Sequence, residues 1–250
     1  MTQGKDREAV FNWTDLSAYR VDRAIQDYGQ LFGWSFQGSH RYKYALSDSA
    51  PVAAIFKMPH RFAKLKMPAF WMSYINVANL DRSIELVERH EKAAIEIAPE
   101  PFGSDARIAL IRDPSGAGVT LYEGPDLATD AIRRSPGDVI DRYQHGPKIK
   151  IVQPFYEAVF GWSFEKVADH PWPAFDARNA NSIHVAKFEQ VPTDIRGKFS
   201  YWMPCFAVQE KHSFLATLEK LNGQVLHNFG DGRLMIADRQ QAHFLIQSTA

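Results

Sequence analysis

The chain has 250 residues, with 29 lysine and arginine residues against 29 aspartate and glutamate residues, and 45% of its residues are hydrophobic. This composition is typical of a globular protein, and the balanced charge gives no global field for attracting nucleic acid or an anionic membrane. The single cysteine, Cys205, excludes an intramolecular disulfide framework and a cysteine-built zinc site. No apolar run of about 18 residues and no signal-peptide pattern occurs, so we expect a cytoplasmic protein with neither a nucleic-acid nor a membrane partner.

The first predicted elements form one module. A short strand at residues 10–16 is followed by apolar residues at helical spacing over residues 19–32, and the next residue, Gly33, suits a helix end. Three strand-sized segments separated by turn residues follow at 34–37, 42–46 and 52–57. The segment 57–66 carries lysines and arginines but no acidic residue. We interpret it as a solvated connector, with binding of an anionic ligand tail as the alternative.

The same order of elements returns from Phe70. A strand to Val77 precedes a helix over residues 80–92, and three strands follow at 94–98, 107–112 and 118–123. The segment Asp113-Pro114-Ser115-Gly116 supplies strong turn chemistry between the last two strands. The second half of the chain shows the order twice more, so we predict four modules, near residues 10–58, 69–123, 138–190 and 199–247.

The two halves of the chain repeat each other. The motif Tyr28-x-x-x-Phe32-Gly33-Trp34-Ser35-Phe36 returns as Tyr156-x-x-x-Phe160-Gly161-Trp162-Ser163-Phe164. Trp71-Met72 returns as Trp202-Met203, and the pattern that begins at Asp113 returns from Asp238. Because these matches keep their order, they predict duplicated domains. We expect an N-terminal tail (1–9), a first domain (10–123), a linker bounded by glycine and proline (124–137) and a second domain (138–248).

These motifs carry a resemblance to the vicinal-oxygen-chelate superfamily, which includes glyoxalase I, the bleomycin-resistance proteins and the extradiol dioxygenases. The residues that carry it are the FGW motif after the first helix of each half, the DPSGA motif at 113–117, and the strand openings at Trp71 and Trp202. Two fused domains look most similar to a tandem bacterial branch that carries a hydroxylase label. The resemblance implies an α+β fold, a tandem repeat of two domains. Each domain would contain two βαβββ modules whose curved mixed sheets enclose a cup.

The resemblance also implies where a metal would bind, because metal-using members hold a divalent ion with histidine or glutamate side chains from the opening and closing strands. By strand register, these positions carry Trp13, Met72 and Thr120 in the first domain and Asp141, Met203 and Leu245 in the second. His184 falls near a fourth position. A divalent ion needs convergent imidazole, carboxylate or thiolate ligands. We therefore expect a degenerate site with no metal and no cofactor.

Residues two apart on a strand share a face, so the neighbours of these positions are expected to line the cups. The predicted ligand-binding residues are Trp13, Asp15, Met72, Tyr74, Asn76 and Thr120 in the first domain and Asp141, Tyr143, His184, Met203 and Cys205 in the second. The first set is amphipathic and the second more apolar. Asp15 as a general base with Tyr74 as proton donor is the candidate catalytic pair; a structural hydrogen bond from a tyrosine or asparagine to Asp15 is the alternative. The proline-stiffened aromatic segment 169–175 is a candidate cover for the second cup.

The leading hypothesis is a small-molecule-binding protein that sequesters an organic ligand in one cup or performs metal-free chemistry on it. One alternative is a metal-dependent lyase or dioxygenase acting on a small oxygenated substrate. Another is a non-catalytic interaction protein whose cups are filled by core side chains. The sequence leaves open whether the protein is an enzyme, which ligand it binds and which domain works. We expect a monomer or a weak homodimer.

Overall fold

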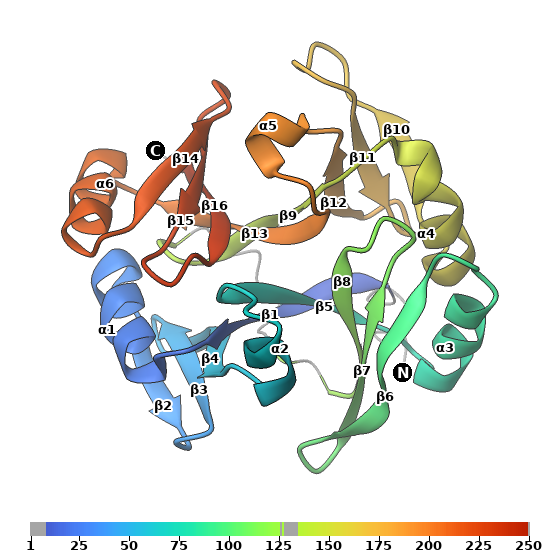
Figure 1. Ribbon diagram of the computed structural model, residues 1–250, viewed down its shortest axis with the longest axis horizontal. Helices are drawn as coiled ribbons and strands as arrows, with labels where there is room; N and C mark the ends of the chain where they lie inside the picture. Colours follow the sequence, from blue (N-terminus) through green and yellow to red (C-terminus); the bar gives the residue numbers. More distant parts are fainter. Residues whose placement is uncertain (1–8, 126, 128–134, 250) are drawn as a thin grey trace. The chain divides into compact units, whose positions relative to one another are not determined.

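The computed structural model describes residues 9–125, 127 and 135–249 and confirms the predicted mixed α+β class (Figure 1). The strands form two eight-stranded mixed sheets. The first has the strand order β2-β3-β4-β1-β5-β8-β7-β6 and the second β10-β11-β12-β9-β13-β16-β15-β14. The identical order in the two sheets is the structural counterpart of the repeated sequence motifs.

The elements of the first sheet and the helices between them are β1 (Val10–Ala18), α1 (Val21–Phe32), β2 (Ser35–Gly38), β3 (Tyr42–Ser47), β4 (Ala50–Lys57), α2 (His60–Lys64), β5 (Phe70–Asn76), α3 (Leu80–Glu88), β6 (Ala94–Phe102), β7 (Ala106–Arg112) and β8 (Gly118–Glu123). Those of the second are β9 (Val139–His145), η1 (Ile149–Ile151), α4 (Gln153–Phe160), β10 (Ser163–Lys166), β11 (Ala174–Arg178), β12 (His184–Glu189), α5 (Thr193–Arg196), β13 (Tyr201–Val208), α6 (Lys211–Lys220), β14 (Gln224–Asn228), β15 (Arg233–Ala237) and β16 (His243–Ser248). No described helix has the length and apolar content needed to cross a membrane.

The ends of the helices follow local sequence chemistry. Gly33 and Gly161 end α1 and α4 in the left-handed conformation, with φ of 72° and 66°, as predicted for Gly33. Asn79 caps α3 by accepting a hydrogen bond from the Arg82 backbone nitrogen. The predicted helix over 80–92 is too long, because α3 ends at Glu88. The basic segment 57–66 contains the short helix α2, which the sequence pattern did not predict.

The described residues divide into two compact units. Unit 1 comprises residues 9–12, 73–125 and 141–202, and unit 2 comprises 13–72, 127, 135–140 and 203–249. Each unit therefore combines modules from both halves of the sequence: unit 1 the second and third modules, unit 2 the first and fourth. The predicted domain boundaries, which follow the two halves, stay a prediction.

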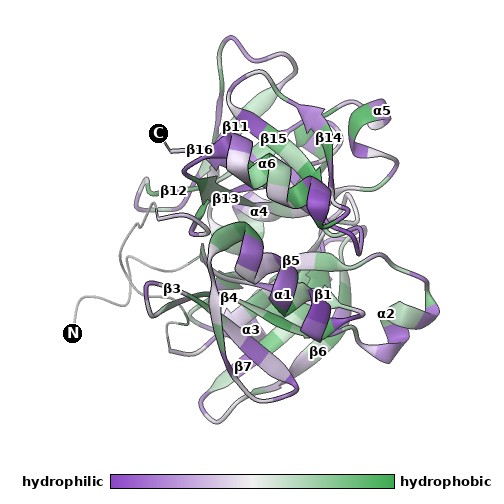
Figure 2. Cartoon of the chain, turned by 90° about the vertical axis from the view of Figure 1, so that its left-hand side faces the viewer, coloured by the Kyte–Doolittle hydropathy of each residue, from purple (hydrophilic) through white to green (hydrophobic). Residues whose placement is uncertain are grey.

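Each unit has its own core between a pair of helices and the strands beneath them. In unit 1, α3 and α4 lie side by side (Figure 1). Leu121 shares the core with Phe155 there. In unit 2, α1 and α6 lie side by side (Figure 1). Leu16 shares the core with Phe206 and Phe244 there. Figure 2 shows hydrophilic and hydrophobic residues along both α1 and α6, as expected of helices with one buried face.

A buried Trp–Tyr–Asp chain joins the modules of unit 1. Trp202 Nε1 donates to the Tyr156 hydroxyl (3.1 Å), and Tyr156 donates to Asp113 Oδ2 (2.9 Å). The Trp162 ring stacks on Tyr156 with centroids 5.1 Å apart and 6° between the planes. All these residues come from the repeated motifs, so the motif residues form the contacts that join different modules within unit 1.

Unit 2 contains a Trp–Tyr–Asp hydrogen-bond chain of the same kind. Trp71 Nε1 donates to the Tyr28 hydroxyl (3.2 Å), and Tyr28 donates to Asp238 Oδ2 (3.1 Å). The Trp34 ring stacks on Tyr28 with centroids 5.8 Å apart. Burial is the largest cause that raises the pKa of Tyr28 well above 10, followed by the charge of Asp238, so Tyr28 remains a hydrogen-bond donor.

The two stacked tryptophans differ in one hydrogen bond, which gives a stability prediction. Trp162 Nε1 donates to the Ala9 carbonyl (2.7 Å), whereas Trp34 Nε1 is buried without an acceptor among the described residues. Trp162→Phe should therefore lower the free energy of unfolding by about 1–2 kcal/mol more than Trp34→Phe, since only the first leaves a carbonyl without its donor. Urea unfolding followed by far-UV circular dichroism measures both losses; equal losses would contradict the assignment.

Candidate functional site

One face of β1, β3 and β4 in unit 2 carries aromatic rings and a carboxylate. The strand register places Asp15 beside Ala54 and Ala54 beside Tyr44, so their side chains share a face. The opposite face, with Leu16 and Ile55, packs into the core of unit 2. We define the aromatic wall as the residues Trp13, Asp15, Tyr42, Tyr44 and Phe56.

A hydrogen-bond chain runs through the aromatic wall. Trp13 Nε1 donates to the Tyr42 hydroxyl (2.9 Å), which donates to Asp15 Oδ2 (3.0 Å). Burial is the largest cause that raises the pKa of Tyr42 well above 10, and the charge of Asp15 is the next. Tyr42 is therefore a phenol at neutral pH and points its hydrogen at the carboxylate. Trp13 and Asp15 are each 1% exposed, so both hydrogen bonds lie in the protein interior.

The rings of the aromatic wall are close enough to form a continuous apolar surface. The Trp13 and Tyr44 ring centroids lie 6.0 Å apart, and those of Tyr42 and Tyr44 lie 5.2 Å apart. Tyr42 stacks on Phe56 at 6.0 Å. Tyr42, Tyr44 and Phe56 are all partly exposed, so within unit 2 the surface is not sealed. Such an array can contact a flat ring through its partly exposed members, and Asp15, 1% exposed and hydrogen-bonded to Tyr42, is the polar group directly behind them.

The structure brings together two of the ligand-binding residues predicted in unit 2 and buries others. Trp13 and Asp15 are brought together, but through Tyr42, which the sequence analysis missed although Tyr42 and Tyr44 alternate on a predicted strand. Met72 is partly buried, and its carbonyl accepts a hydrogen bond from Thr14 (2.8 Å). The other two predicted residues, Met203 and Cys205, are fully buried.

The predicted catalytic pair is divided between the units. Asp15 belongs to unit 2 and Tyr74 to unit 1, so their partnership stays a prediction. The phenol that donates to Asp15 within its own unit is Tyr42. This contact is the structural Asp–Tyr hydrogen bond offered as the alternative, with Tyr42 in place of Tyr74.

Unit 1 holds the remaining predicted residues. Tyr74 and Thr120 are direct partners on β5 and β8, and Asn76 is the partner of Tyr122. On the second sheet, Tyr143 is the partner of Lys187 on β12. The two candidate ligands of the second domain do meet, because His184 Nε2 lies 3.1 Å from Asp141 Oδ1.

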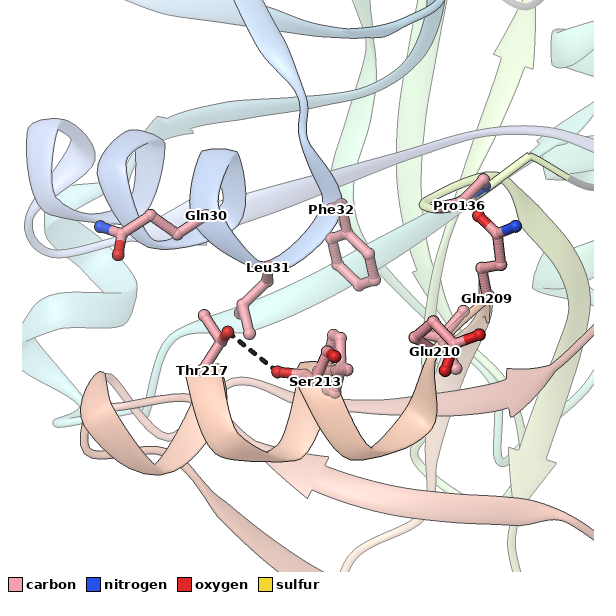
Figure 3. Close-up of a pocket in the computed structure, with 10 residues that line it drawn as sticks. Gln30, Leu31, Phe32, Pro136, Gln209, Glu210, Ser213 and Thr217 are labelled. Carbon is pink, nitrogen blue, oxygen red and sulfur yellow. Dashed lines mark hydrogen bonds between the residues drawn. The ribbon is translucent and has the colours of Figure 1, made fainter.

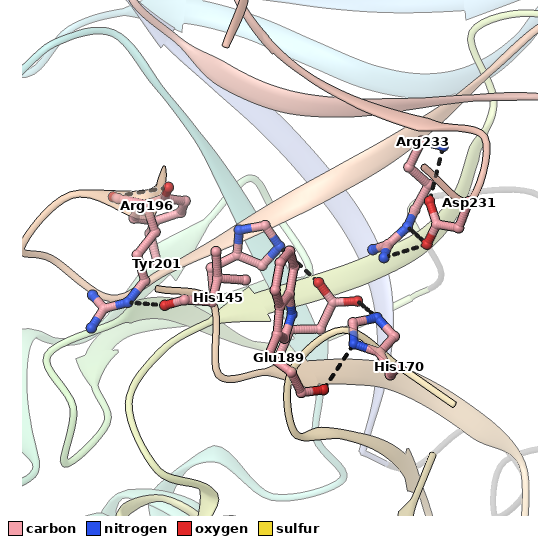
Figure 4. A network of polar contacts seen from close by, with 9 residues as sticks. His145, His170, Glu189, Arg196, Tyr201, Asp231 and Arg233 are labelled. Carbon is pink, nitrogen blue, oxygen red and sulfur yellow. Dashed lines mark hydrogen bonds and ion pairs between the residues drawn. The ribbon is translucent and has the colours of Figure 1, made fainter. Parts of the chain in front are cut away.

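Unit 1 contains a polar cluster that was not predicted from the sequence (Figure 4). The carboxylate of Glu189 lies between two imidazoles, with Oε2 3.3 Å from His145 Nε2 and Oε1 3.2 Å from His170 Nε2. The His145 and Glu189 side chains are 0% and 1% exposed, so the cluster is a desolvated acid–base group. His145 follows Asp141 and Tyr143 at intervals of two on β9, and this alternation was the available signal.

The polar cluster also includes a contact with the segment 169–175. His170 belongs to this segment, and its second ring nitrogen lies 2.9 Å from the Trp172 carbonyl (Figure 4). Tyr201 lies beside His145 with ring centroids 6.0 Å apart, and burial raises the pKa of Tyr201 to about 12. The predicted role of the segment as a cover for the second cup stays a prediction.

The residues at the positions predicted for metal ligands do not have the chemistry that a divalent ion needs. The Trp13 indole nitrogen carries a hydrogen, which it donates to Tyr42, so it has no lone pair to offer. Beyond it, the positions carry thioether, hydroxyl and alkyl side chains and one carboxylate, Asp141. Within residues 9–125, 127 and 135–249, no group of three or more histidine, cysteine, aspartate or glutamate side chains is arranged to hold a metal ion.

Comparison with known proteins identifies relatives of similar sequence. No protein-family model matches the chain. It is 27% identical over 255 residues to the protein named "Putative glyoxylase CFP32" of Mycobacterium bovis, an alignment that covers 98% of the chain and 96% of that protein. The protein of the same name in Mycobacterium tuberculosis matches equally.

Solved structures agree with this similarity. The Mn(II)-bound glyoxalase of Novosphingobium aromaticivorans has a TM-score of 0.61 at 11% identity, covering 97% of the chain and 82% of that structure. The 2,2',3-trihydroxybiphenyl 1,2-dioxygenase of Sphingomonas wittichii has a TM-score of 0.61 at 11% identity, covering 96% and 90%. The chain has the fold of the glyoxalases and extradiol dioxygenases, which confirms the predicted resemblance to the vicinal-oxygen-chelate superfamily. The finer resemblance to a tandem bacterial branch stays a prediction.

Proposed function

We propose that the protein binds a small hydroxylated aromatic molecule at the aromatic wall, without a divalent metal ion at positions 13, 72 and 120. The observation that carries the proposal is the hydrogen-bond chain from Trp13 through Tyr42 to Asp15. Trp13, an indole, stands at a position predicted for a metal ligand, and the chain joins it through Tyr42 to the Asp15 carboxylate. Flat rings with one directed polar group are typical of sites that select a small aromatic ligand.

The class of ligand follows from the charge of the aromatic wall. A divalent cation would favour an ionised phenol, because it attracts the phenolate oxygen. The Asp15 carboxylate does the opposite: it accepts a hydrogen from a neutral hydroxyl and repels a phenolate. Two structures similar to this chain are named as dioxygenases of 2,2',3-trihydroxybiphenyl and of catechol, which supports a hydroxylated ring as the first class to test. We therefore propose binding of the neutral form of such a ligand.

Asp15→Asn tests the role of the carboxylate. The substitution keeps the size of the side chain but removes its charge, and a hydrogen bond to a charged group contributes about 1.5–3 kcal/mol. We expect the dissociation constant for catechol, used as the probe, to rise at least about tenfold in isothermal titration calorimetry. Tyr42→Phe keeps Asp15 but removes the phenol that orients it, so a smaller loss is expected.

The matched control is Asp141→Asn, which changes a carboxylate in unit 1 that contacts His184 instead of the aromatic wall. It should leave catechol binding unchanged. An Asp15→Asn variant that binds catechol as the natural protein does would contradict the proposal. Stoichiometric iron, manganese, nickel or zinc in protein purified without metal-affinity columns would favour a metal-dependent lyase or dioxygenase instead.

A further inference from the structure

A groove in unit 2 lies apart from the aromatic wall, between the end of α1 and the beginning of α6 (Figure 3). Its volume is about 190 Å³, and it is open to solvent on one side. The Phe32 and Phe214 rings form its apolar floor, with centroids 5.4 Å apart. Leu31 and Val208 extend this apolar surface, and Pro136 closes one end.

On its α6 side the groove is lined by two small side chains. Ser213 and Thr217 lie one turn apart on α6 and face the groove, and the Thr217 hydroxyl donates to the Ser213 carbonyl (2.9 Å, Figure 3). When the repeat is aligned on Val77 and Val208, the corresponding residues of α3 are Arg82 and Leu86. Ser213 and Thr217 are thus smaller than the residues at the corresponding positions of α3.

The rim of the groove is polar and carries one charge. Among its ten lining residues, Glu210 is the single ionisable one, and Gln209 lies near it at the same end of the groove, whereas Gln30 lies at the opposite end (Figure 3). Glu210 occupies the N-cap position of α6, but its side chain does not cap the helix. The corresponding residue of α3, Asn79, does cap its helix. The Glu210 carboxylate is therefore available to a ligand above the groove.

We propose that this groove binds a primary amine joined by a short chain to one aromatic ring. The ring lies on Phe32 and Phe214, and the ammonium group reaches Glu210. The groove has a volume of about 190 Å³, which is room enough for one ring and a short chain. The inference is independent of the proposed function, because it uses no residue of the aromatic wall.

The affinity is expected to be low and sensitive to salt. Glu210 is exposed, so its attraction for the ammonium group is screened by water and ions. The apolar contact of a single ring adds the larger share of the binding free energy. A dissociation constant of about 1 mM is the expected order, which corresponds to the weak end of small-ligand binding.

The test is a ¹H–¹⁵N NMR titration with three probes that share one ring and differ in charge: phenethylamine, 2-phenylethanol and phenylacetate. Phenethylamine should bind tightest and shift the amide signals of Leu31, Glu210 and Thr217. Phenylacetate should bind weakest, because Glu210 repels it. Equal affinity for the three probes, or shifts that do not include these amides, would overturn the proposal.

Variants of the groove test the contact with Glu210 and the apolar contact of the ring separately. Glu210→Lys should weaken phenethylamine binding at least about fivefold and strengthen phenylacetate binding, since it reverses the single rim charge. Thr217→Leu introduces the residue found in α3 and should abolish binding by filling the groove. Glu219→Gln, on an exposed part of α6 outside the groove, and Asp15→Asn should both leave phenethylamine binding unchanged. Unchanged binding in Glu210→Lys, or its loss in Asp15→Asn, would overturn the proposal even if Thr217→Leu failed to fold.

Discussion

Asp113→Ala is expected to lower the free energy of unfolding by about 4 kcal/mol, because it leaves several buried donors without an acceptor. Asp113 is 0% exposed. Its Oδ1 accepts hydrogen bonds from the Ser115 and Ala117 backbone nitrogens at 2.8 and 3.1 Å, and its Oδ2 accepts from Tyr156 and Gln144. The substitution removes both the turn and the module contact of unit 1. Urea unfolding near neutral pH measures the loss.

Burial raises the pKa of Asp113 above its ordinary value, and the hydrogen bonds from Ser115 and Tyr156 oppose this shift. Because burial is the larger effect, the neutral amide in Asp113→Asn should be tolerated better than alanine. The control is Asp105→Ala, in an exposed turn where the carboxylate accepts from its neighbour Ser104, and its effect should stay within about 0.5 kcal/mol. A loss below about 1 kcal/mol for Asp113→Ala would contradict the role of the carboxylate in joining the modules.

Glu189→Ala is expected to destabilise the protein by about 3 kcal/mol, because it removes the carboxylate that lies between two imidazoles in the polar cluster. His145 is fully buried, so its ring cannot regain water as a partner. The loss should also make the segment 169–175 more mobile, because His170 of this segment loses its contact with Glu189. Trypsin cleavage after Lys166, which is exposed just before this segment, should therefore become faster.

Glu165→Ala provides the matched control for the polar cluster. Glu165 is exposed on β10, so its removal should change the stability by less than about 0.5 kcal/mol. Glu189→Gln should fall between the two variants, since the amide can still accept one hydrogen bond but carries no charge. If Glu189→Ala unfolds at the same urea concentration as the natural protein and resists trypsin equally, the polar cluster does not stabilise unit 1.

The fold was predictable from the sequence because its signals are local or repeated. The FGW motifs marked the ends of α1 and α4, and period-two alternation marked the strands. The contacts between modules were not predictable in the same way. Asp113 was interpreted as a turn residue, which it is, but it also accepts the hydrogen bond of Tyr156. Hydrophobic periodicity shows that a helix face is buried, and it does not show which distant module covers that face.

The candidate site was predictable only along single strands. Alternation placed Trp13 and Asp15 on one face of β1, and the structure agrees. Tyr42 was missed because its position beside them depends on the register of β3 and β4, which a single sequence does not specify. His170 was missed as a partner of Glu189 because the conformation of a loop decides that contact.

Binding of a neutral hydroxylated ring at the aromatic wall, through Asp15 and without a metal ion, can be measured in solution. Calorimetric titration of catechol into protein treated with EDTA tests it most directly. We expect saturable binding that EDTA treatment does not change and that Asp15→Asn loses. Binding that disappears with EDTA and returns only when Fe(II) or Mn(II) is restored would contradict it.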